Sequence, residues 1–410
     1  MPVRADGPGP RPTHWPAVLA AVAGGVAIGL NVGKVPLALP VMRAEFGLSL
    51  VQAGAVSSML STLAVTTAIA WGLLAGRIGA LRLVLIGLLL GAGASLLAMG
   101  APGYGLLIAT RVVEGAGFLA VAVAAPALVS AASAPADRRF ALGVWATYMP
   151  AGAGLAMALS PLVMGLAGWR GLWALAAFGL LLAAAAAVAQ RRHYAAAGGS
   201  SHGVPAPLTA PEGPLGVLRR PLAWVLSLAF GCWALQHFAL IVWMPTFLKE
   251  QRGLGDALVA GLTATMLLAC VPGNLIGGAL VQRGFSRGRL VAAAHVGTGL
   301  CGLVAMQEGW PDLLRYAASV ALSFIGGLIP AAVMSSSTQL ARDPRQIGVL
   351  QGLIMQGSQL GQFIGTPLIA AVVAASGQWA SARWVTGGAA VLGLGLGLAA
   401  HRLSRGTAGH

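Results

Sequence analysis

The sequence predicts an all-α membrane protein of twelve transmembrane helices, arranged as two six-helix bundles. Of its 410 residues, 57% are hydrophobic and only 9% are charged, whereas an ordinary soluble domain carries about 25% charged residues. Its mean hydropathy is +0.82, and glycine, which is frequent in membrane helices, contributes 59 residues. So few charges could not cover a soluble protein of this size. A soluble enzyme, a disordered chain and a disulfide-built scaffold are therefore excluded.

Twelve apolar runs are each long enough to cross a bilayer, which takes about 20 residues. The first six cover residues 16–39, 51–75, 83–101, 104–132, 141–166 and 171–189. The second six cover residues 222–247, 257–281, 290–307, 313–340, 347–375 and 384–400. The first run is too long for the apolar core of a signal peptide, and eleven more runs follow it, so we interpret it as the first span.

A polar interval divides the runs into two groups of six. Residues 190–221 contain two arginine pairs, a Gly-Gly-Ser-Ser stretch and several prolines, a composition typical of flexible linkers. The expected organisation is a cytoplasmic tail, a six-helix bundle, a cytoplasmic linker, a second bundle and a short cytoplasmic tail, covering residues 1–15, 16–189, 190–221, 222–402 and 403–410.

The distribution of basic residues predicts the orientation. With the N-terminus inside, the cytoplasmic segments hold 17 of the 25 basic residues and the opposite side holds 6, while Lys34 and Arg111 fall within spans. Basic residues near the ends of spans favour the cytoplasm. We therefore expect both termini and the linker to be cytoplasmic, in a multi-pass protein of the cell inner membrane.

The net charge of +15 does not predict nucleic-acid binding, because the arginines are spread between apolar runs instead of forming one exposed patch. The three cysteines lack the spacing of metal ligands, so we interpret them as small apolar residues. The sequence contains no phosphate-binding Gly-x4-Gly-Lys-Ser/Thr loop, no HExxH on a helix and no GxSxG at a strand-to-helix turn. We expect no metal, no cofactor and no enzymatic activity.

The two halves are related in sequence at a nearly constant offset. Residues 72–77 and 278–283 align with glycine and arginine in register, and the same shift of 206 pairs Met149 with Met355 and Pro161 with Pro367. An even number of spans per repeat makes the repeats parallel. Parallel six-span halves around a central cavity are a transporter architecture.

Two short motifs within this scaffold resemble those of the major facilitator superfamily. The loop Gly72-x4-Arg77-x-Gly79-x2-Arg82 is similar to the family's cytoplasmic loop signature, with Gly76 where the family usually has Asp, and Arg111-x3-Gly115-x-Gly117 is similar to its second motif. The resemblance implies alternating access. It implies a role in conformational gating for the loop residues and their repeat counterparts, Gly72, Arg77, Gly79, Arg82, Gly278 and Arg283.

Further resemblances bear on the substrate. Gly29-Leu30-Asn31 followed by Lys34 is similar to the cyanate and nitroimidazole permease branch of the superfamily, and organic-anion carriers are a related possibility. The glycine-rich pattern of proton-coupled drug antiporters is largely missing from the fifth span, which reads Ala156-x3-Ser160-Pro161. Because of this departure, drug efflux is the less favoured function.

Few ionisable side chains fall inside the spans, where each costs about 2.5–3.5 kcal/mol at a helix centre and is a functional candidate. Lys34 shares a helix face with Asn31, three residues earlier. It is expected either to attract an anionic substrate together with Asn31, or to snorkel to the outer interface.

Arg111 and Glu114 are also three residues apart in the fourth span. They could simply neutralise each other. In superfamily members the first and fourth helices line the cavity, so the resemblance implies that Lys34 lies near this pair. Arg111 is then a candidate for substrate binding, and Glu114 is a candidate proton carrier with Arg111 as its partner.

The second half supplies neutral polar groups, Gln236, His237, Gln356 and Gln359. With Tyr148 of the first half, they are expected to bind substrate, and His237 is a second proton-coupling candidate. Each also has a plain packing explanation, since a histidine or glutamine inside a bundle can simply bond a neighbouring helix.

We therefore expect a monomeric secondary active transporter of a small organic anion such as a carboxylate, working by alternating access as a proton symporter. Its partners are the solute, protons and the lipid bilayer. The alternatives are efflux of a drug or metabolite, a membrane-embedded enzyme, and a sensor that kept a transporter scaffold.

Overall fold

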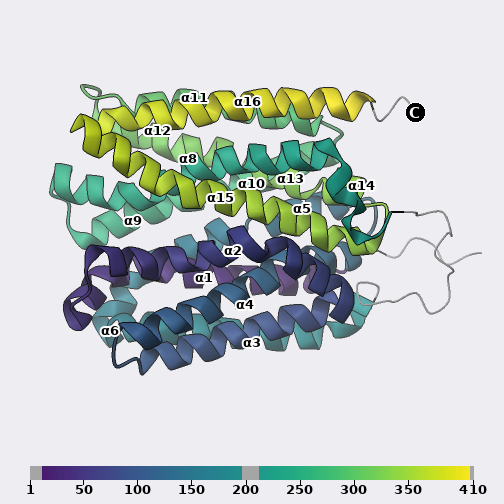
Figure 1. Ribbon diagram of the computed structural model, residues 1–410, viewed down its shortest axis with the longest axis horizontal. Coiled ribbons are helices and arrows are strands. Elements are labelled where there is room, and N and C mark those ends of the chain that lie inside the picture. The colour runs from purple at the N-terminus through teal and green to yellow at the C-terminus, as the bar shows by residue number, and fades with distance from the viewer. Residues whose placement is uncertain (1–11, 196–211, 407–410) are drawn as a thin grey trace, which may run out of the picture.

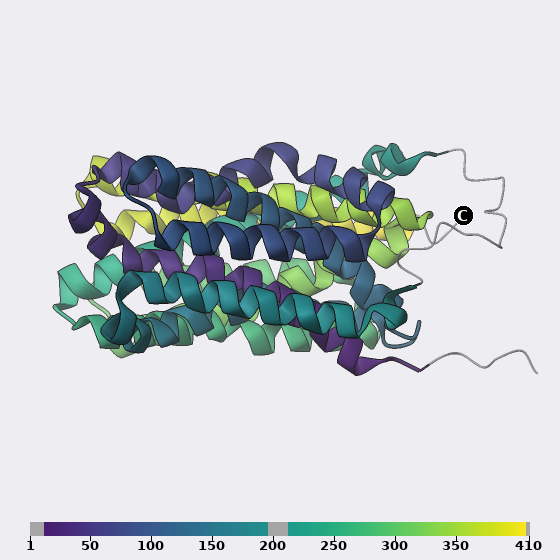
Figure 2. The same cartoon turned by 90° about the horizontal axis from the view of Figure 1, so that it is seen from below.

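The computed structural model describes residues 12–195 and 212–406, and within these ranges every regular element is a helix. Long helices run side by side along the molecule, with the two halves of the chain forming separate groups (Figure 1). Helix α1 starts and helix α16 finishes at the same end of the molecule (Figures 1 and 2). We call this the terminal end and the other the far end.

The first half contains six labelled helices that make six spans. Their bounds are α1 Trp15–Phe46, α2 Leu50–Ile78, α3 Ala80–Met99, α4 Tyr104–Ala131, α5 Arg138–Ala146 and α6 Tyr148–Ala189. The fifth span is α5 with the beginning of α6, and the remainder of α6 is the sixth. The chain leaves the helical conformation between them at Gly168, with φ 62° and ψ −166°, a conformation that glycine adopts without steric cost.

The second half repeats this plan. Its α-helices are α8 Pro221–Arg252, α9 Asp256–Leu268, α10 Cys270–Gln282, α11 Arg287–Met306, α12 Asp312–Gly326, α13 Leu328–Met334, α14 Ser337–Leu340, α15 Pro344–Ser376 and α16 Ala382–Gly406. Short 3₁₀ helices η1, η2 and η3 cover Arg191–Tyr194, Pro214–Arg219 and Trp379–Ser381. Helices α9 and α10 follow one another as one span, as do α12 and α13.

The predicted number of spans is confirmed. Ten segments of the described chain are long and apolar enough to cross a membrane. The 52-residue segment Arg138–Ala189 counts as two because the chain turns at Gly168, and α15 supplies the twelfth. Residues 1–11, 196–211 and 407–410 lie outside the described residues, and with them most of the predicted linker and tails.

Helix α1 extends seven residues beyond its predicted end at residue 39. Its last turn carries Glu45, which accepts a hydrogen bond of 2.6 Å from Trp169 and pairs with Arg170 at 2.6 Å. These contacts hold a polar turn against α6, so the helix continues until Gly47, whose φ of 61° ends it.

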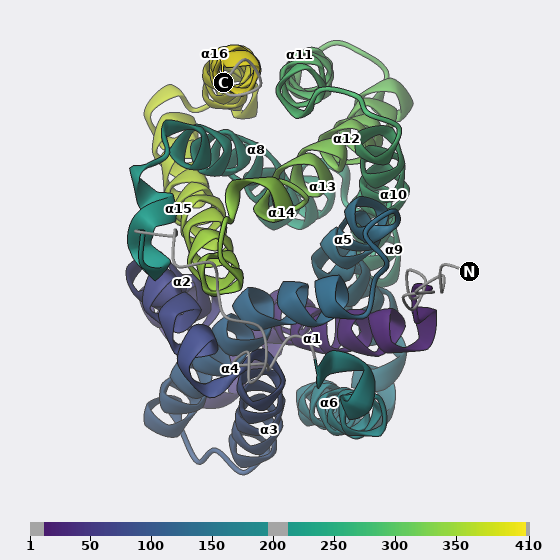
Figure 3. The same cartoon turned by 90° about the vertical axis from the view of Figure 1, so that its right-hand side faces the viewer.

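The halves approach each other most closely toward the terminal end. A Cβ atom on Gly143 of α5 would lie 2.6 Å from the Cα of Gly278 of α10, and one on Gly348 of α15 would lie 2.6 Å from the carbonyl oxygen of Gly72 of α2. The repeat offset of 206 relates Gly72 to Gly278, so the two contacts use equivalent helices. Seen from the terminal end, α2 lies beside α15 and α5 beside α10 (Figure 3).

Candidate functional site: a central cavity and a buried charge cluster

A cavity of about 1150 Å³ lies between the halves and is lined by residues of both. Its wall includes Arg43 near the far end of α1, Ser57 of α2 and Asp256 at the start of α9. The cavity therefore reaches the far end, while the glycine contacts close the terminal end. Ligand sites of this kind are typically about 300–1,000 Å³ and mostly apolar.

The wall of this cavity is largely apolar and aromatic. Phe118 lines it from the first half, and Phe230, Trp233 and Phe238 line it from the second. Among the described residues, the charged side chains in the wall are Arg43, Arg111 and Asp256.

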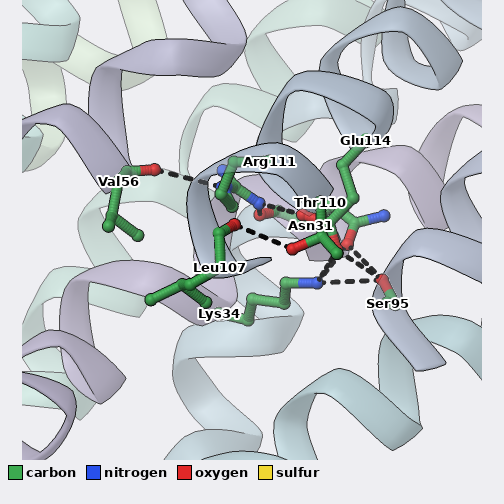
Figure 4. A network of polar contacts seen from close by, with 8 residues as sticks. All are labelled: Asn31, Lys34, Val56, Ser95, Leu107, Thr110, Arg111 and Glu114. Carbon is green, nitrogen blue, oxygen red and sulfur yellow. Dashed lines mark hydrogen bonds and ion pairs between the residues drawn. The ribbon is translucent and has the colours of Figure 1, made fainter. Parts of the chain in front are cut away.

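Beside the cavity, the first half buries a cluster of charged and polar side chains centred on Glu114 (Figure 4). Lys34 Nζ pairs with Glu114 Oε1 at 2.7 Å, and Arg111 pairs with Glu114 Oε2. The Ser95 hydroxyl donates to Glu114 Oε1 at 2.6 Å. Lys34, Arg111 and Glu114 are each 1% exposed, so these pairs are shielded from water.

The ammonium group of Lys34 is surrounded by hydrogen-bond acceptors and an aromatic ring. Lys34 Nζ also donates to Asn31 Oδ1 and, at 3.0 Å, to Ser95 Oγ. It lies 4.4 Å from the centre of the Trp173 ring, within the range of a cation–π contact. Each donor of the ammonium group thus faces an acceptor or a ring.

Arg111 is tied to the backbone of two other helices. Its Nε donates to the carbonyl oxygen of Val56 on α2 at 3.0 Å, and its Nη1 donates to that of Asn31 on α1 at 3.3 Å. The guanidinium therefore links α1, α2 and α4.

Glycines explain how α2 and α3 come close enough to α4 to build this cluster. A Cβ on Gly115 would lie 3.3 Å from Leu60 Cα of α2, and one on Gly87 of α3 would lie 2.7 Å from the carbonyl oxygen of Gly117. The Arg111-x3-Gly115-x-Gly117 motif thus provides a cation and two surfaces for close helix packing.

Two cations and one carboxylate leave the cluster with one uncompensated positive charge. A buried charge without a partner is costly. Of the cluster residues, Arg111 borders the cavity, while Asn31, Lys34, Ser95 and Glu114 lie behind it. An anion in the cavity could therefore complete the charge balance through Arg111.

The expected proximity of Lys34, Arg111 and Glu114 is confirmed by their contacts. The snorkelling alternative for Lys34 is wrong, because its amine is buried and held by Glu114, Ser95 and Asn31. Asn31 and Lys34 do not border the cavity in this conformation, so they could act on a substrate there through Arg111.

Of the other predicted substrate-binding residues, three border the cavity: Tyr148, His237 and Gln359. The Tyr148 hydroxyl donates to Met355 Sδ of the opposite half at 3.7 Å. His237 Nε2 lies 3.0 Å from Ser323 Oγ, and its ring stacks on Trp233 with centroids 4.4 Å apart.

Gln236 and Gln356 lie away from the cavity wall. Gln356 Nε2 donates to the carbonyl oxygen of Val65 at 2.6 Å, which joins α15 to α2. Gln236 is fully buried, and neither atom of its amide has a partner among the described residues. For Gln356 the contact supports the packing explanation.

The gating candidates fall into two groups. Gly72 and Gly278 form the close contacts between the halves. Gly79, with φ 90°, turns the chain from α2 to α3, and Arg77, Arg82 and Arg283 are exposed beside these turns.

Sequence reasoning missed Ser95 and Trp173. A signal for Ser95 existed, since it is the one hydroxyl residue in α3, whose other residues apart from Arg82 are apolar or glycine. Trp173 offered no comparable signal, because tryptophan is common in membrane helices and its contact with Lys34 depends on how α6 packs.

The chain resembles known transporters throughout. The family model described as Major Facilitator Superfamily matches residues 21–366. The chain is 24% identical over 379 residues to the probable sulfoacetate transporter SauU of Cupriavidus necator, covering 88% of this chain and 87% of the relative. It is 28% identical to the cyanate transport protein CynX of Escherichia coli, covering 80% of this chain and 84% of that protein.

Two further similarities agree with this pattern. A 2-nitroimidazole transporter of Escherichia coli is 28% identical over 40% of this chain and 41% of its own length. Among solved structures, FucP in the outward conformation superposes with a TM-score of 0.71 and 17% identity, covering 94% of this chain and 98% of that chain. The resemblance to FucP supports the twelve-helix fold.

Proposed function

The chain belongs to the Major Facilitator Superfamily, and from that premise we propose that it carries a small organic anion across a bacterial inner membrane by alternating access. Family membership makes it a multi-pass membrane transporter of small solutes and not an enzyme. The proposal adds that the solute is an anion such as a carboxylate, that protons are co-transported, and that both termini are cytoplasmic.

The buried positive charge of the cluster carries the proposal. Lys34 and Arg111 share the single carboxylate of Glu114, and Arg111 borders the cavity. An anion bound at Arg111 would bring the buried charge to zero, which a neutral solute could not do. The chain's relatives SauU, a probable sulfoacetate transporter, and CynX, a cyanate transport protein, support an anionic solute here.

Proton coupling follows from the same shared contacts. When an anion attracts Arg111, Glu114 loses part of the positive field that favours its ionised form, so anion binding favours proton binding. This coupling is reciprocal, because a proton on Glu114 would release Arg111 to the anion.

One observation favours the alternative of efflux of a neutral compound. Phe118, Phe230, Trp233 and Phe238 give the cavity broad aromatic walls, which suit an apolar solute. A related protein named as a 2-nitroimidazole transporter keeps this alternative open to test.

Counterflow in proteoliposomes tests the proposal and separates a transporter from a sensor, which would bind without exchange. Purified protein is reconstituted and exchange of labelled small anions and neutral drugs is measured with and without a proton gradient. Exchange of anions is expected. If neutral compounds were exchanged while every anion failed, the proposal would be rejected.

Variants of the two cations sharpen this test. Arg111→Gln should abolish anion exchange, whereas Arg111→Lys should keep part of it. Lys34→Ala should weaken exchange far more than Lys34→Arg, since arginine retains the charge beside Glu114. Arg43→Gln is the matched control, because Arg43 lines the cavity but lies outside the cluster.

A further inference from the structure

We infer that the charge of the substrate decides whether a proton travels with it: a dianion is carried with one proton on Glu114, and a monoanion with none. The inference rests on the proposed function, since it assumes that an organic anion binds at Arg111. It restricts the proposed proton co-transport to dianionic substrates and sets the number of protons moved.

The rule comes from the charges that the cluster contains. With Glu114 ionised, Lys34 and Arg111 leave one positive charge in excess, and a monoanion at Arg111 balances it. A dianion would leave one negative charge in excess. Protonation of Glu114 removes that negative charge, so the dianion with its proton again gives a neutral site.

The Glu114 carboxylate is the group in the cluster that can take up this proton. Lys34 and Asn31 of α1, Ser95 of α3 and Arg111 of α4 contact it or its partners directly. Beyond them, Val56 of α2 offers a carbonyl oxygen to Arg111 and Trp173 of α6 covers Lys34. Lysine and arginine are already protonated, and the remaining groups do not titrate near neutral pH.

His237 is the competing proton acceptor in the cavity wall. Its ring lies in the opposite half, stacked on Trp233 and 3.0 Å from the Ser323 hydroxyl. Within the described part of the chain, the other charged wall residues are Arg43, toward the far end of α1, and Asp256, at the start of α9. One positive and one negative charge there cancel, which leaves the balance at the cluster unchanged.

The proton follows a path that the contacts define. Arg111 covers Glu114 Oε2, so a dianion that draws the guanidinium toward the cavity uncovers this oxygen. A proton from water on the open side then binds there. After the cavity opens on the other side, the dianion leaves, Arg111 returns to Glu114 and the proton is released to water on that side.

The test compares ethanesulfonate, a monoanion, with sulfoacetate, a dianion built on the same two-carbon sulfonate. Sulfonates stay ionised, so neither compound leaks across the bilayer as a neutral acid. Proteoliposomes containing the wild-type protein are held at zero membrane potential, with the outside one pH unit more acidic than the inside. Sulfoacetate should accumulate about tenfold and acidify the interior, whereas ethanesulfonate should exchange without accumulation.

Variants then assign the proton to its acceptor. Glu114→Gln should exchange sulfoacetate without proton-driven accumulation and should bind ethanesulfonate more tightly than the wild type, because two cations without a carboxylate attract a monoanion more strongly. His237→Gln changes a cavity-wall residue and is expected to lower the affinity for sulfoacetate, but the accumulation ratio under the pH gradient should stay about tenfold, because that ratio depends on the number of protons moved and not on the affinity. If Glu114→Gln does not fold, the comparison of the two anions in the wild type still decides the rule.

The outcomes separate the two proposals. Absence of exchange of every anion by the wild type would reject the proposed function itself. Exchange of both sulfonates with equal proton coupling would leave the proposed function standing and overturn the charge rule. Loss of coupling in His237→Gln with coupling retained in Glu114→Gln would overturn the assignment to Glu114.

Discussion

Replacing Glu114 with glutamine tests how the buried cluster stabilises the first half. Glu114 is 1% exposed and accepts from Lys34 at 2.7 Å, from Ser95 at 2.6 Å and from Arg111. Glutamine has nearly the same shape, so the substitution removes the charge while leaving little cavity. Two buried cations then face each other without a carboxylate.

The expected cost is large. Removing one partner of a buried ion pair costs about 3–5 kcal/mol. A change of 1 kcal/mol shifts Tm by about 2–4 °C in a domain of 150–250 residues, so Tm of the first half should fall by roughly 6–20 °C. Intrinsic tryptophan fluorescence during heating in detergent measures this fall. A thiol dye would not, because the free cysteines, Cys232, Cys270 and Cys301, all lie in the second half.

Two further variants make the test specific. Glu45→Gln breaks the pair with Arg170, also 2.6 Å long but with side chains 35% and 43% exposed, and should cost only about 0–1 kcal/mol. Lys34→Met combined with Glu114→Gln leaves one uncompensated positive charge, as in the wild type, and should recover at least about 1 kcal/mol relative to Glu114→Gln alone.

The reasoning would be refuted if Glu114→Gln melted within about 2 °C of the wild type, which corresponds to less than 1 kcal/mol. A double variant no more stable than the single one would also contradict it, because the loss would then not come from uncompensated positive charge.

Two other predictions concern the terminal end. Gly278→Val should prevent α10 from closing against α5, because a Cβ on Gly278 would lie 2.8 Å from a backbone Cα. A cysteine introduced at Ser58 in the cavity wall should then react several-fold more slowly with an impermeant thiol reagent. The control variant Gly93→Val, whose added Cβ meets nothing within 4 Å, should leave this reaction rate unchanged. Asp343 caps α15 and its pKa is lowered by hydrogen bonds from Arg345. Its stabilisation is therefore complete above the ordinary pKa and lost as pH falls through the lowered one. Asp343→Ala should cost about 1 kcal/mol at pH 7, and chemical denaturation should find that this difference shrinks as the pH falls below about 3.9, the ordinary pKa of Asp; a constant difference across pH would contradict the capping role.

The spans could be predicted because hydropathy is a local property of the sequence. A bilayer requires a run of apolar residues wherever the chain crosses it, so most helix bounds lie within about three residues of the expectation. The larger differences are at the far ends of α1 and α8, which reach Phe46 and Arg252, and at the terminal end of α16, which reaches Gly406. In α1 the tertiary contact between Glu45 and Arg170 stabilises the additional turns, and the local sequence does not predict this contact.

The charged part of the site could also be predicted, because an ionisable side chain inside a span is rare and costly. Lys34, Arg111 and Glu114 were found in this way. Ser95 and the Val56 carbonyl were missed, since their role depends on how α3 and α2 pack against α4. The same holds for Gln236 and Gln356, whose residue type suits a binding site but whose helix faces point away from the cavity wall.

The sequence by itself determined that this chain crosses the membrane twelve times, that its halves are repeats, and that its intramembrane charge is confined to the first half. Only the tertiary structure decided that Lys34 lies behind the cavity wall and that Arg111 is the member of the cluster which borders the cavity. The physical reason is that spacing fixes which residues share a helix face. The rotation of that face is set by close contacts between helices far apart in the chain, such as Gly87 with Gly117.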